Sequence, residues 1–309
     1  MEKQSSPDKI APAQTVTFDA IMPAMMALRA EESGVKRAST DPLTLLVLGV
    51  MAGAFISFGA IFATTVSAGT IAITAADGNL ALSTGLPYGV VRLLTGVVFS
   101  VGLILVVIGG AELFTGNNII VMAWASGKVK TRALLLNWVL AFIGNFAGAI
   151  LTAALMFYTT QYTFGGGAVG LAALNTANAK ASLAFIPALT LGVMCNALVC
   201  LAVWMCFSAR TTVDRVLTIV PPIAAFVAAG FEHSIANVYF IPMGLFIKAG
   251  APDSFWQTLG KTPADFPELT WGNFFVGNLL PVTIGNIIGG SVMVGAVYWF
   301  VYLRQKALT

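Results

Sequence analysis

The sequence predicts an all-α membrane protein with six transmembrane helices, arranged as an inverted repeat of three plus three. Of its 309 residues, 58% are hydrophobic and only 9% are charged, and the mean hydropathy is +0.87. A soluble domain carries about 25% charged residues, because its surface must stay wet. Six apolar stretches each exceed the roughly 20 residues that a spanning helix needs. The net charge of +3 is too small to indicate a nucleic-acid partner.

The first 42 residues are predicted to form a cytoplasmic segment ahead of the membrane domain. Residues 1–17 are polar with two prolines, and we expect them to be disordered. From Phe18 to Glu32 the apolar residues fall at helical spacing. This pattern predicts an amphipathic helix that lies on the membrane surface or packs on the bundle, and the sequence leaves both open. We expect no secretory signal peptide, because the first apolar run starts only after about 40 mixed polar residues.

The membrane domain is predicted over residues 43–302, with a short tail at 303–309. The second and fifth spans are too long for one straight helix, and each has a polar interruption, AELFTGNN at 111–118 and GFEHSIAN at 230–237. Gly/Pro-rich stretches such as 163–170 and 249–268 are expected to be loops. The candidate spans are 43–67, 88–126, 133–158, 183–207, 213–249 and 272–302.

Basic residues predict the orientation, because loops on the cytoplasmic side carry an excess of Lys and Arg. Six spans place both termini on one side, together with the loops after the second and fourth spans. Twelve of the 16 Lys and Arg residues then fall on that side. We therefore expect a multi-pass membrane protein with both termini in the cytoplasm.

The two halves, residues 43–158 and 183–302, share one plan: a span, an interrupted span and a span. Three spans per half force opposite orientations, and paired interruptions are a good pointer to a central site. Irregular backbone survives at membrane depth only where protein or a wet cavity satisfies its polar groups. Gly49/Gly53 and Gly144/Gly148 have the spacing of close helix crossings.

Ionisable residues at the interruptions are the candidate functional groups. His233, the only histidine, lies mid-span beside Glu232, where a titratable group is costly and functional by default. Its ring could instead satisfy carbonyls freed by the break. Glu112 and Glu232 are expected to accept hydrogen bonds from backbone N–H groups or Asn side chains, because a bare carboxylate would repel an anion.

Further polar residues near the breaks have two interpretations each. Thr115 can cap the following half-helix or donate its hydroxyl to an anion. Lys180 is read as a solvated loop lysine, with attraction of anions as the alternative. Six asparagines in or beside the spans must be paired: Asn137, Asn145, Asn196, Asn237, Asn278 and Asn286.

Other side chains near these points have simpler readings. Apolar neighbours form either constrictions or core: Phe99, Leu103, Phe114, Val199 and Phe226. Cys195, Cys200 and Cys206 lie in one apolar stretch without His nearby, so we expect packing residues rather than a metal site or disulfides.

Three motifs at the breaks and in the last span closely resemble the signatures of the formate/nitrite transporter family. They are GGAELFTGNNIIVMAWASG at 109–127, GFEHSIANVYFIPMG at 230–244 and NLLPVTIGNIIGG at 278–290. The resemblance runs from about residue 18 to residue 304. FIPMG and PVTIGNIIGG are more similar to the formate branch than to the nitrite or hydrosulfide branches.

The resemblance implies an aquaporin-like protomer, a homopentamer in membrane lipid, and a pore in each subunit. It implies that His233 is the central pore histidine, with Thr115 as its neighbour and Lys180 in the external vestibule. Asn196 matches a pore asparagine, and Glu232 flanks the histidine. The N-terminal segment matches one thought to close the cytoplasmic mouth. The implied constrictions are Phe99, Leu103 and Phe226 outside, and Leu113, Phe114 and Val199 inside.

The expected function is bidirectional passage of formate, with nitrite as the main alternative and acetate as a further small anion. His233 either donates a proton to the passing anion or stays neutral as a hydrogen-bond donor, and the sequence leaves both open. A neutral-solute channel of aquaporin type is less favoured, because neither break contains Asn-Pro-Ala. An ammonium channel would carry a pair of histidines. We expect no enzyme activity and no cofactor, because one His and three clustered Cys supply few ligands.

Overall fold

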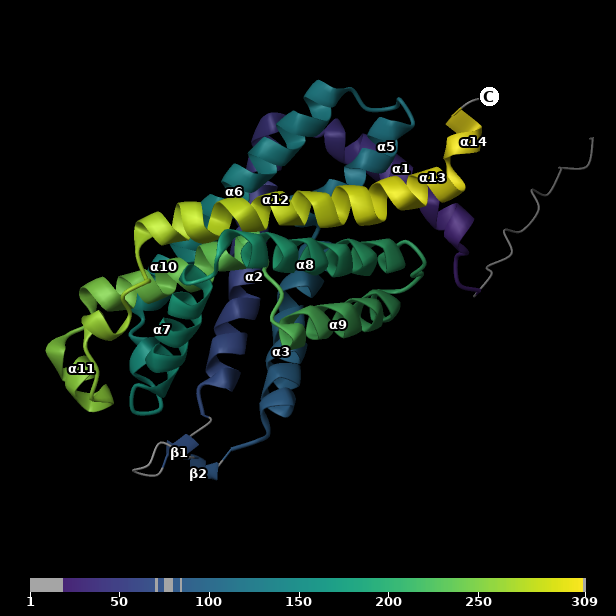
Figure 1. Cartoon of the computed structure of the whole chain (residues 1–309). Coiled ribbons are helices and arrows are strands. Elements are labelled where there is room, and N and C mark those ends of the chain that lie inside the picture. The colour runs from purple at the N-terminus through teal and green to yellow at the C-terminus, as the bar shows by residue number, and fades with distance from the viewer. Residues whose placement is uncertain (1–18, 70–71, 75–79, 84, 308–309) are drawn as a thin grey trace, which may run out of the picture.

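The computed structural model describes residues 19–69, 72–74, 80–83 and 85–307 (Figure 1). The segment 1–17 that we expect to be disordered, and Phe18, lie outside these residues. The α-helices of the described residues are α1 (Pro23–Ala38), α2 (Pro42–Ser67), α3 (Tyr88–Gly109), α4 (Phe114–Asn117), α5 (Val121–Ala125), α6 (Thr131–Tyr158), α7 (Ala168–Ala181), α8 (Phe185–Cys206), α9 (Thr212–Ala229), α10 (Ser234–Gly250), α11 (Asp253–Leu259), α12 (Leu280–Ile287), α13 (Val297–Tyr302) and α14 (Arg304–Ala307).

Six helical segments of the described residues are long and apolar enough to cross a membrane, as predicted. They are α2, α3, α6, α8, α9 and the last segment, which runs continuously from Asn273 to Tyr302. This last segment alternates α12 and α13 with the π-helices η4 (Asn273–Leu279) and η5 (Ile288–Ala296). Short 3-10 turns complete the helices: η1 (Asn118–Ile120), η2 (Gln161–Thr163) and η3 (Pro263–Asp265).

The N-terminal helix α1 starts five residues later than predicted and continues six residues further. Pro23 occupies its first turn, where a missing N–H costs nothing, so the helix begins there rather than at Phe18. Its buried face, Met26, Ala27 and Ala30, packs in a cluster with Trp204 of α8. The helix therefore packs on the bundle, beside α5 and α13 and on the side of the molecule away from α7 and α11 (Figure 1).

Two stretches predicted as loops contain helices. α7 begins at Ala168, directly after three glycines with positive φ. The loop predicted over 163–170 therefore ends at residue 167. Its alanine-rich sequence favours a helix, and its buried face of small residues lets it lie close against α10. At 14 residues it is too short for a search based on spans. α11 likewise follows a turn of 109° after α10.

One small exception to the all-helical prediction lies between α2 and α3. Strands β1 (Ala72–Thr74) and β2 (Leu80–Ser83) pair antiparallel, with Ala72 opposite Ser83. The hairpin lies beyond the ends of the two spans (Figure 1). It does not alter the helical membrane domain.

Glycines bring the spans of each half into direct backbone contact. A Cβ added at Gly53 or Gly148 would overlap a backbone carbonyl at the α2–α6 crossing. In the second half, a Cβ at Gly285 or Gly289 would overlap a carbonyl of α8. The prediction of close crossings at Gly49/Gly53 and Gly144/Gly148 is confirmed, and the second half repeats it.

The two interrupted spans break in the same way. Gly110 with φ +74° caps α3, and Gly230 with φ +77° caps α9; both have the left-handed conformation that glycine adopts at helix ends. Three non-helical residues follow, and α4 or α10 then begins at Phe114 or Ser234. The inverted three-plus-three repeat with two broken spans is confirmed, and both breaks point their polar groups into the protein.

Candidate functional site

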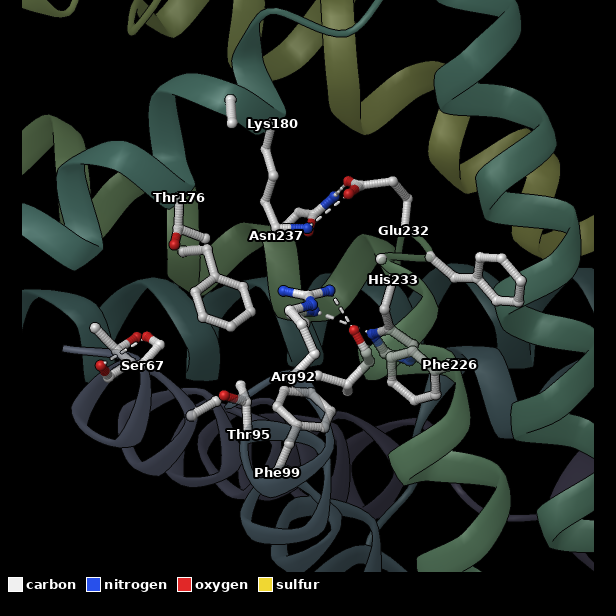
Figure 2. A pocket seen from close by; sticks show the side chains of 18 of the residues that line it. Ser67, Arg92, Thr95, Phe99, Thr176, Lys180, Phe226, Glu232, His233 and Asn237 are labelled. Carbon is white, nitrogen blue, oxygen red and sulfur yellow. Dashed lines mark hydrogen bonds and ion pairs between the residues drawn. The ribbon is translucent and has the colours of Figure 1, made fainter. Parts of the chain in front are cut away.

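A cavity of about 430 Å³ lies beside the second break and reaches His233 (Figure 2). Helices α2, α3, α7, α9 and α10 contribute its walls. Its aromatic walls are Phe99, Phe226, Phe231 and Phe240, and its charged side chains are Arg92, Lys180 and Glu232. Ala63, Thr64, Ser67, Thr95, Asn175, Thr176, Ala179, Leu183, Leu191, Val227, Gly230, His233, Ala236 and Asn237 complete the lining.

His233 ends the second break as the N-cap residue of α10. Its Nδ1 accepts a hydrogen bond from the backbone N–H of Ala236 at 3.1 Å. Its Nε2 lies 2.9 Å from the hydroxyl of Thr115. In a neutral imidazole only one nitrogen carries a proton, so accepting at Nδ1 places that proton on Nε2. Nε2–H therefore points at Thr115, and the ring is only 3% exposed.

Thr115 comes from the first break and is completely buried. Its carbonyl accepts hydrogen bonds from Asn196 Nδ2 at 3.2 Å and from the Cys200 thiol at 3.4 Å. The pair Thr115–His233 is thus a direct contact between the two halves, 118 residues apart in sequence. The structure brings together the two residues that the sequence analysis placed at the centre.

The two phenylalanines expected at the outer constriction lie beside this pair. Phe99 and Phe226 meet edge to face, with ring centroids 5.7 Å apart, and both are 3% exposed. The Phe226 ring also lies nearly parallel to the His233 ring, 6.2 Å away. Leu103 is buried and lies outside the cavity lining.

The three residues expected at the inner constriction are buried and lie outside the cavity lining: Leu113, Phe114 and Val199. Phe114 packs edge-on against Phe142 and Trp138 of α6. It therefore anchors α4 to the third span of the first half.

Glu232 is held by an ion pair and two amides. Its Oε1 accepts from Lys180 Nζ at 2.7 Å, and its Oε2 accepts from Asn237 at 2.6 Å and Asn278 at 3.2 Å. The expected hydrogen bonds from asparagine are confirmed. The reading of Lys180 as a solvated loop lysine is wrong, because α7 carries it into the cavity, where its side chain is 17% exposed.

Glu112 is held in the same way in the first half. Its Oε2 accepts from Asn117 at 2.7 Å, and Asn117 also donates to Asn137. Arg37 of α1 takes the place of the lysine, with Nε 3.8 Å from Glu112 and a 2.6 Å bond to Asn117. The sequence analysis missed Arg37 and Asn117. A comparison of the two breaks would have found Asn117, because both have Glu and Asn five residues apart.

Two further asparagines tie each break to its half. Asn145 accepts from Phe114 N at 2.8 Å and donates to the carbonyls of Gly49 and Glu112. Asn286 repeats all three bonds, with Ser234 N, Gly192 O and Glu232 O. Buried amides in a membrane protein must be paired, and these pairs replace the backbone bonds that each broken span has lost.

Asn196 lies behind the pair and outside the cavity lining, although a pore position is expected from the resemblance. Its Nδ2 donates to Thr115 O, to Asn118 Oδ1 at 2.8 Å and to Asn286 O at 2.7 Å. It is completely buried. In this structure Asn196 positions Thr115 rather than facing the cavity.

The cysteines pack as expected. Cys195 and Cys200 are buried, Cys206 is half-buried, and all three are free thiols. Among the described residues no group of three or more His, Cys, Asp or Glu side chains is placed to hold a metal ion.

The chain was compared with known proteins. Residues 24–300 match the family model "Formate/nitrite transporter". "Formate channel FocA" of Escherichia coli strain K12 is 45% identical over 289 residues, which cover 94% of this chain and 97% of that protein. "Probable formate transporter" of Methanothermobacter thermautotrophicus is 36% identical over 84% of this chain and 89% of its own length.

Solved structures give the same result. "Pentameric formate channel with formate bound" superimposes with a TM-score of 0.76 at 44% identity, covering 85% of this chain and 98% of that one. "FNT family ion channel" superimposes with a TM-score of 0.69 at 26% identity, covering 89% and 98%. With the two broken spans and the buried His–Thr pair between them, this chain belongs to the formate/nitrite transporter family.

Proposed function

We propose that this protein is a formate channel, that it works as a homopentamer in a bacterial inner membrane, and that both of its termini are cytoplasmic. The names and assembly printed for its relatives support the substrate and the pentamer. The observation that carries the proposal is the Thr115–His233 pair at the end of the aromatic-walled cavity. We infer transport rather than catalysis, with nitrite and acetate as competing anions.

The neutral form of His233 is the one that its surroundings support. Nδ1 accepts the N–H of Ala236 and so holds the start of α10. A proton on Nδ1 would point at the backbone N–H of Ala236, so that two donors would face each other. Protonating the ring therefore requires breaking this N-cap hydrogen bond of α10. His233 therefore acts as a fixed donor through Nε2–H, and the hydroxyl proton of Thr115 remains free for an anion.

The passing carboxylate exchanges water for these donors. An isolated carboxylate in an apolar passage is very costly, and Phe99 and Phe226 leave little room for water beside it. His233 lies beside these rings in the same cavity, and Thr115 is its hydrogen-bond partner. A carboxylate that loses water here can therefore accept a hydrogen bond from the Thr115 hydroxyl. Preorganised donors in a dry site stabilise charge more strongly than donors in water do. The anion then crosses as an anion and carries its charge.

The outer surface suits both lipid and neighbouring subunits. Exposed large apolar side chains lie along the spans, among them Leu135, Val139 and Ile143 on α6 and Val292 and Val297 on the last span. Such a surface is incompatible with water over its whole height. With the termini in the cytoplasm, the cavity of Lys180 and Arg92 opens to the outside.

The test is uptake by proteoliposomes at pH 7.5, where very little formate is present as the acid, since such acids titrate near pH 4. Formate, nitrite, acetate and chloride are compared, with internal pH recorded and with or without valinomycin and potassium to compensate charge. His233→Asn is the matched variant. Asparagine keeps an N-cap acceptor for α10 but removes Nε2–H.

We expect formate uptake to rise when valinomycin compensates the charge, and the vesicle interior not to acidify by one proton per formate. We expect His233→Asn to reduce the formate uptake rate at least tenfold. Uptake indifferent to valinomycin, with one proton per formate, would show instead that the anion is protonated in transit. Nitrite clearly faster than formate would overturn the substrate. Light scattering of the purified protein in detergent tests the pentamer.

A further inference from the structure

Three charged side chains line the cavity, and their charges do not cancel. Arg92 and Lys180 are cationic and Glu232 is anionic, so the lining carries a net positive charge of one. Figure 2 shows Arg92 and Lys180 entering the same cavity from different helices, α3 and α7. The question is which of the two cations supplies the excess charge that an anion meets.

The charge of Lys180 is neutralised by Glu232. The Nζ–Oε1 distance is 2.7 Å, and the Glu232 side chain is only 5% exposed. A close ion pair presents a dipole rather than a charge to its surroundings, so its attraction falls off faster with distance. Lys180 also fixes the end of α7 to the last span, because its carbonyl accepts from Asn278. Its observed contacts are those of a structural lysine.

Arg92 has only neutral partners among the residues that the structure describes. Its Nε donates to Ala228 O at 3.4 Å and its guanidinium also donates to Val227 O. No described carboxylate lies within 4.0 Å of it, since the ion pairs there involve Arg37, Lys128 and Lys180. The two carbonyls belong to the last turn of α9, whose dipole offsets about half a charge at most. Arg92 thus keeps an uncompensated charge.

Arg92 lies on the same face of α3 as Phe99, one of the two aromatic residues of the proposed constriction. Arg92, Thr95 and Phe99 all line the cavity and lie three, four and seven residues apart, on one face of α3. An anion held at Arg92 is one helical turn from the Thr95 hydroxyl and two turns from the Phe99–Phe226 contact. The guanidinium has five N–H donors, and the carbonyls of Val227 and Ala228 use only part of them.

We propose that Arg92, rather than Lys180, is the residue that attracts and docks small carboxylates in the cavity before they enter the constriction. This inference rests on the proposed formate channel. The carbonyls of α9 orient the guanidinium, and the remaining donors face a carboxylate. Lys180 pairs with Glu232, and Arg92 binds the substrate. Docking at this distance from the constriction affects capture of formate and not its passage past His233.

The experiment measures initial formate uptake by proteoliposomes against formate concentration, at low and at high ionic strength. The variants are Arg92→Gln, which keeps donors but removes the charge, and Arg92→Lys, which keeps the charge. The matched control is Lys261→Gln, which removes one exposed positive charge from the segment after α11, outside this cavity. All four proteins are first checked for the elution volume of the parent.

We expect Arg92→Gln to raise KM for formate about 3- to 10-fold at low salt, with maximal rate nearly unchanged, because one charge in a cavity mouth changes local anion concentration by about that factor. High salt should shrink this difference, since the screening length falls from about 10 Å at 0.1 M to 3 Å at 1 M. Arg92→Lys should restore most of the KM, and Lys261→Gln should match the parent.

Two outcomes overturn the inference while leaving the channel intact. In the first, Arg92→Gln behaves like Lys261→Gln. In the second, Arg92→Gln lowers the maximal rate at every salt concentration and Arg92→Lys fails to rescue it, which indicates that Arg92 only ties α3 to α9. A parent protein that carries no formate refutes the proposed function itself and the docking role with it.

Discussion

The two halves of the molecule have the same frame but different groups at its centre. Aligned on Glu112 and Glu232, the breaks share the carboxylate, the asparagine five residues later and the following asparagine partner. Even the backbone bonds match, since Glu112 N donates to Leu48 O and Glu232 N to Leu191 O. The frame exists to hold a broken helix, and both halves need it equally.

The residues that differ are those of the Thr115–His233 pair, where we propose that the substrate passes. In the same alignment His233 stands opposite Leu113, and Thr115 stands opposite Ile235. Each half therefore contributes one polar group to the pair, where the other half has a buried apolar one. The first spans of the two halves align on Gly49 and Gly192, whose carbonyls accept from Asn145 and Asn286. In that alignment Asn196, which positions Thr115, stands opposite Gly53, where a side chain would overlap Asn145. A duplicated scaffold thus carries a single, unduplicated site.

The largest loss of stability is expected at the two helix crossings, between α2 and α6 and between α8 and the last span. Gly148→Ala and Gly289→Ala each place a Cβ against a backbone carbonyl, of Val50 and Val193. The spans must then separate, and overpacking of this kind costs about 1–3 kcal/mol or more. Both variants should lower the melting temperature in detergent and the yield of the proposed pentamer by similar amounts.

Gly89→Ala is the control, because it lies in α3 and its added Cβ meets open space. It should leave stability unchanged or slightly raised, as alanine favours a helix over glycine. If only one of the two crossing glycines were sensitive, the crossings would not be equivalent.

The second prediction separates the two carboxylates. Glu232→Gln leaves the half-buried Lys180 without its counter-charge. Because the Lys180 side chain is 17% exposed in the cavity, the loss lies between the values for a buried and an exposed pair, about 1–3 kcal/mol. Glu112→Gln should cost about 1 kcal/mol or less, because Arg37 is 3.8 Å away and its side chain is 26% exposed. Chemical denaturation of the two variants measures the difference.

A rescue tests the cause of that loss. The double variant Glu232→Gln with Lys180→Met removes both charges, so most of the stability should return. Equal losses for Glu112→Gln and Glu232→Gln would mean that the charge pair matters less than the shared amide network.

The third prediction exchanges the polar partner of the first half. Thr115→Val keeps shape but removes the hydroxyl at 2.9 Å from His233. Loss of one such hydrogen bond of about 1.4 kcal/mol should slow formate uptake roughly tenfold, and Thr115→Ser should recover much of it. Ile235→Thr, the equivalent site in the second half, should leave the uptake rate unaltered. A sensitive Ile235 would place the substrate path on both breaks.

Much of the frame could be predicted because it follows from membrane physics. Apolar length sets the spans, and two polar interruptions at matched places require an interior that satisfies them. The expectation that Glu112 and Glu232 accept hydrogen bonds from asparagine side chains is therefore confirmed. His233 and Thr115 were found for the same reason, since a titratable or hydroxyl group at that depth needs a partner or a task.

What could not be predicted depends on short helices and long-range contacts. α7 has no span-length pattern, so Lys180 was read as a solvated loop residue although the helix carries it to Glu232. Arg37 and Arg92 reach partners 80 and 136 residues away, which no local pattern shows. Asn196 was placed in the pore from resemblance, while its three donated bonds are visible only in the folded chain.

The smallest expected effect lies at the first turns of α2 and α8, which occupy equivalent places in the two halves. Asp41 caps α2 by accepting from Thr44 N at 3.0 Å, whereas Ala184 gives α8 no side-chain cap. The bonds with Thr44 lower the pKa of Asp41 below its ordinary value of 3.8. Because that pKa is depressed in the folded state, the cap is fully present above the ordinary value and is lost as pH falls through the lowered one.

Hydrogen exchange of the first turn of α2 should therefore quicken only in acid, and Asp41→Ala should quicken it at neutral pH as well. Ala184→Asp should slow exchange in the first turn of α8, because it supplies the acceptor that α2 already has. Identical exchange of the two first turns in the parent at neutral pH would show that lipid or a neighbouring subunit satisfies the N–H groups of α8. In that case the first turns of α2 and α8 would differ in sequence but not in their protection from exchange.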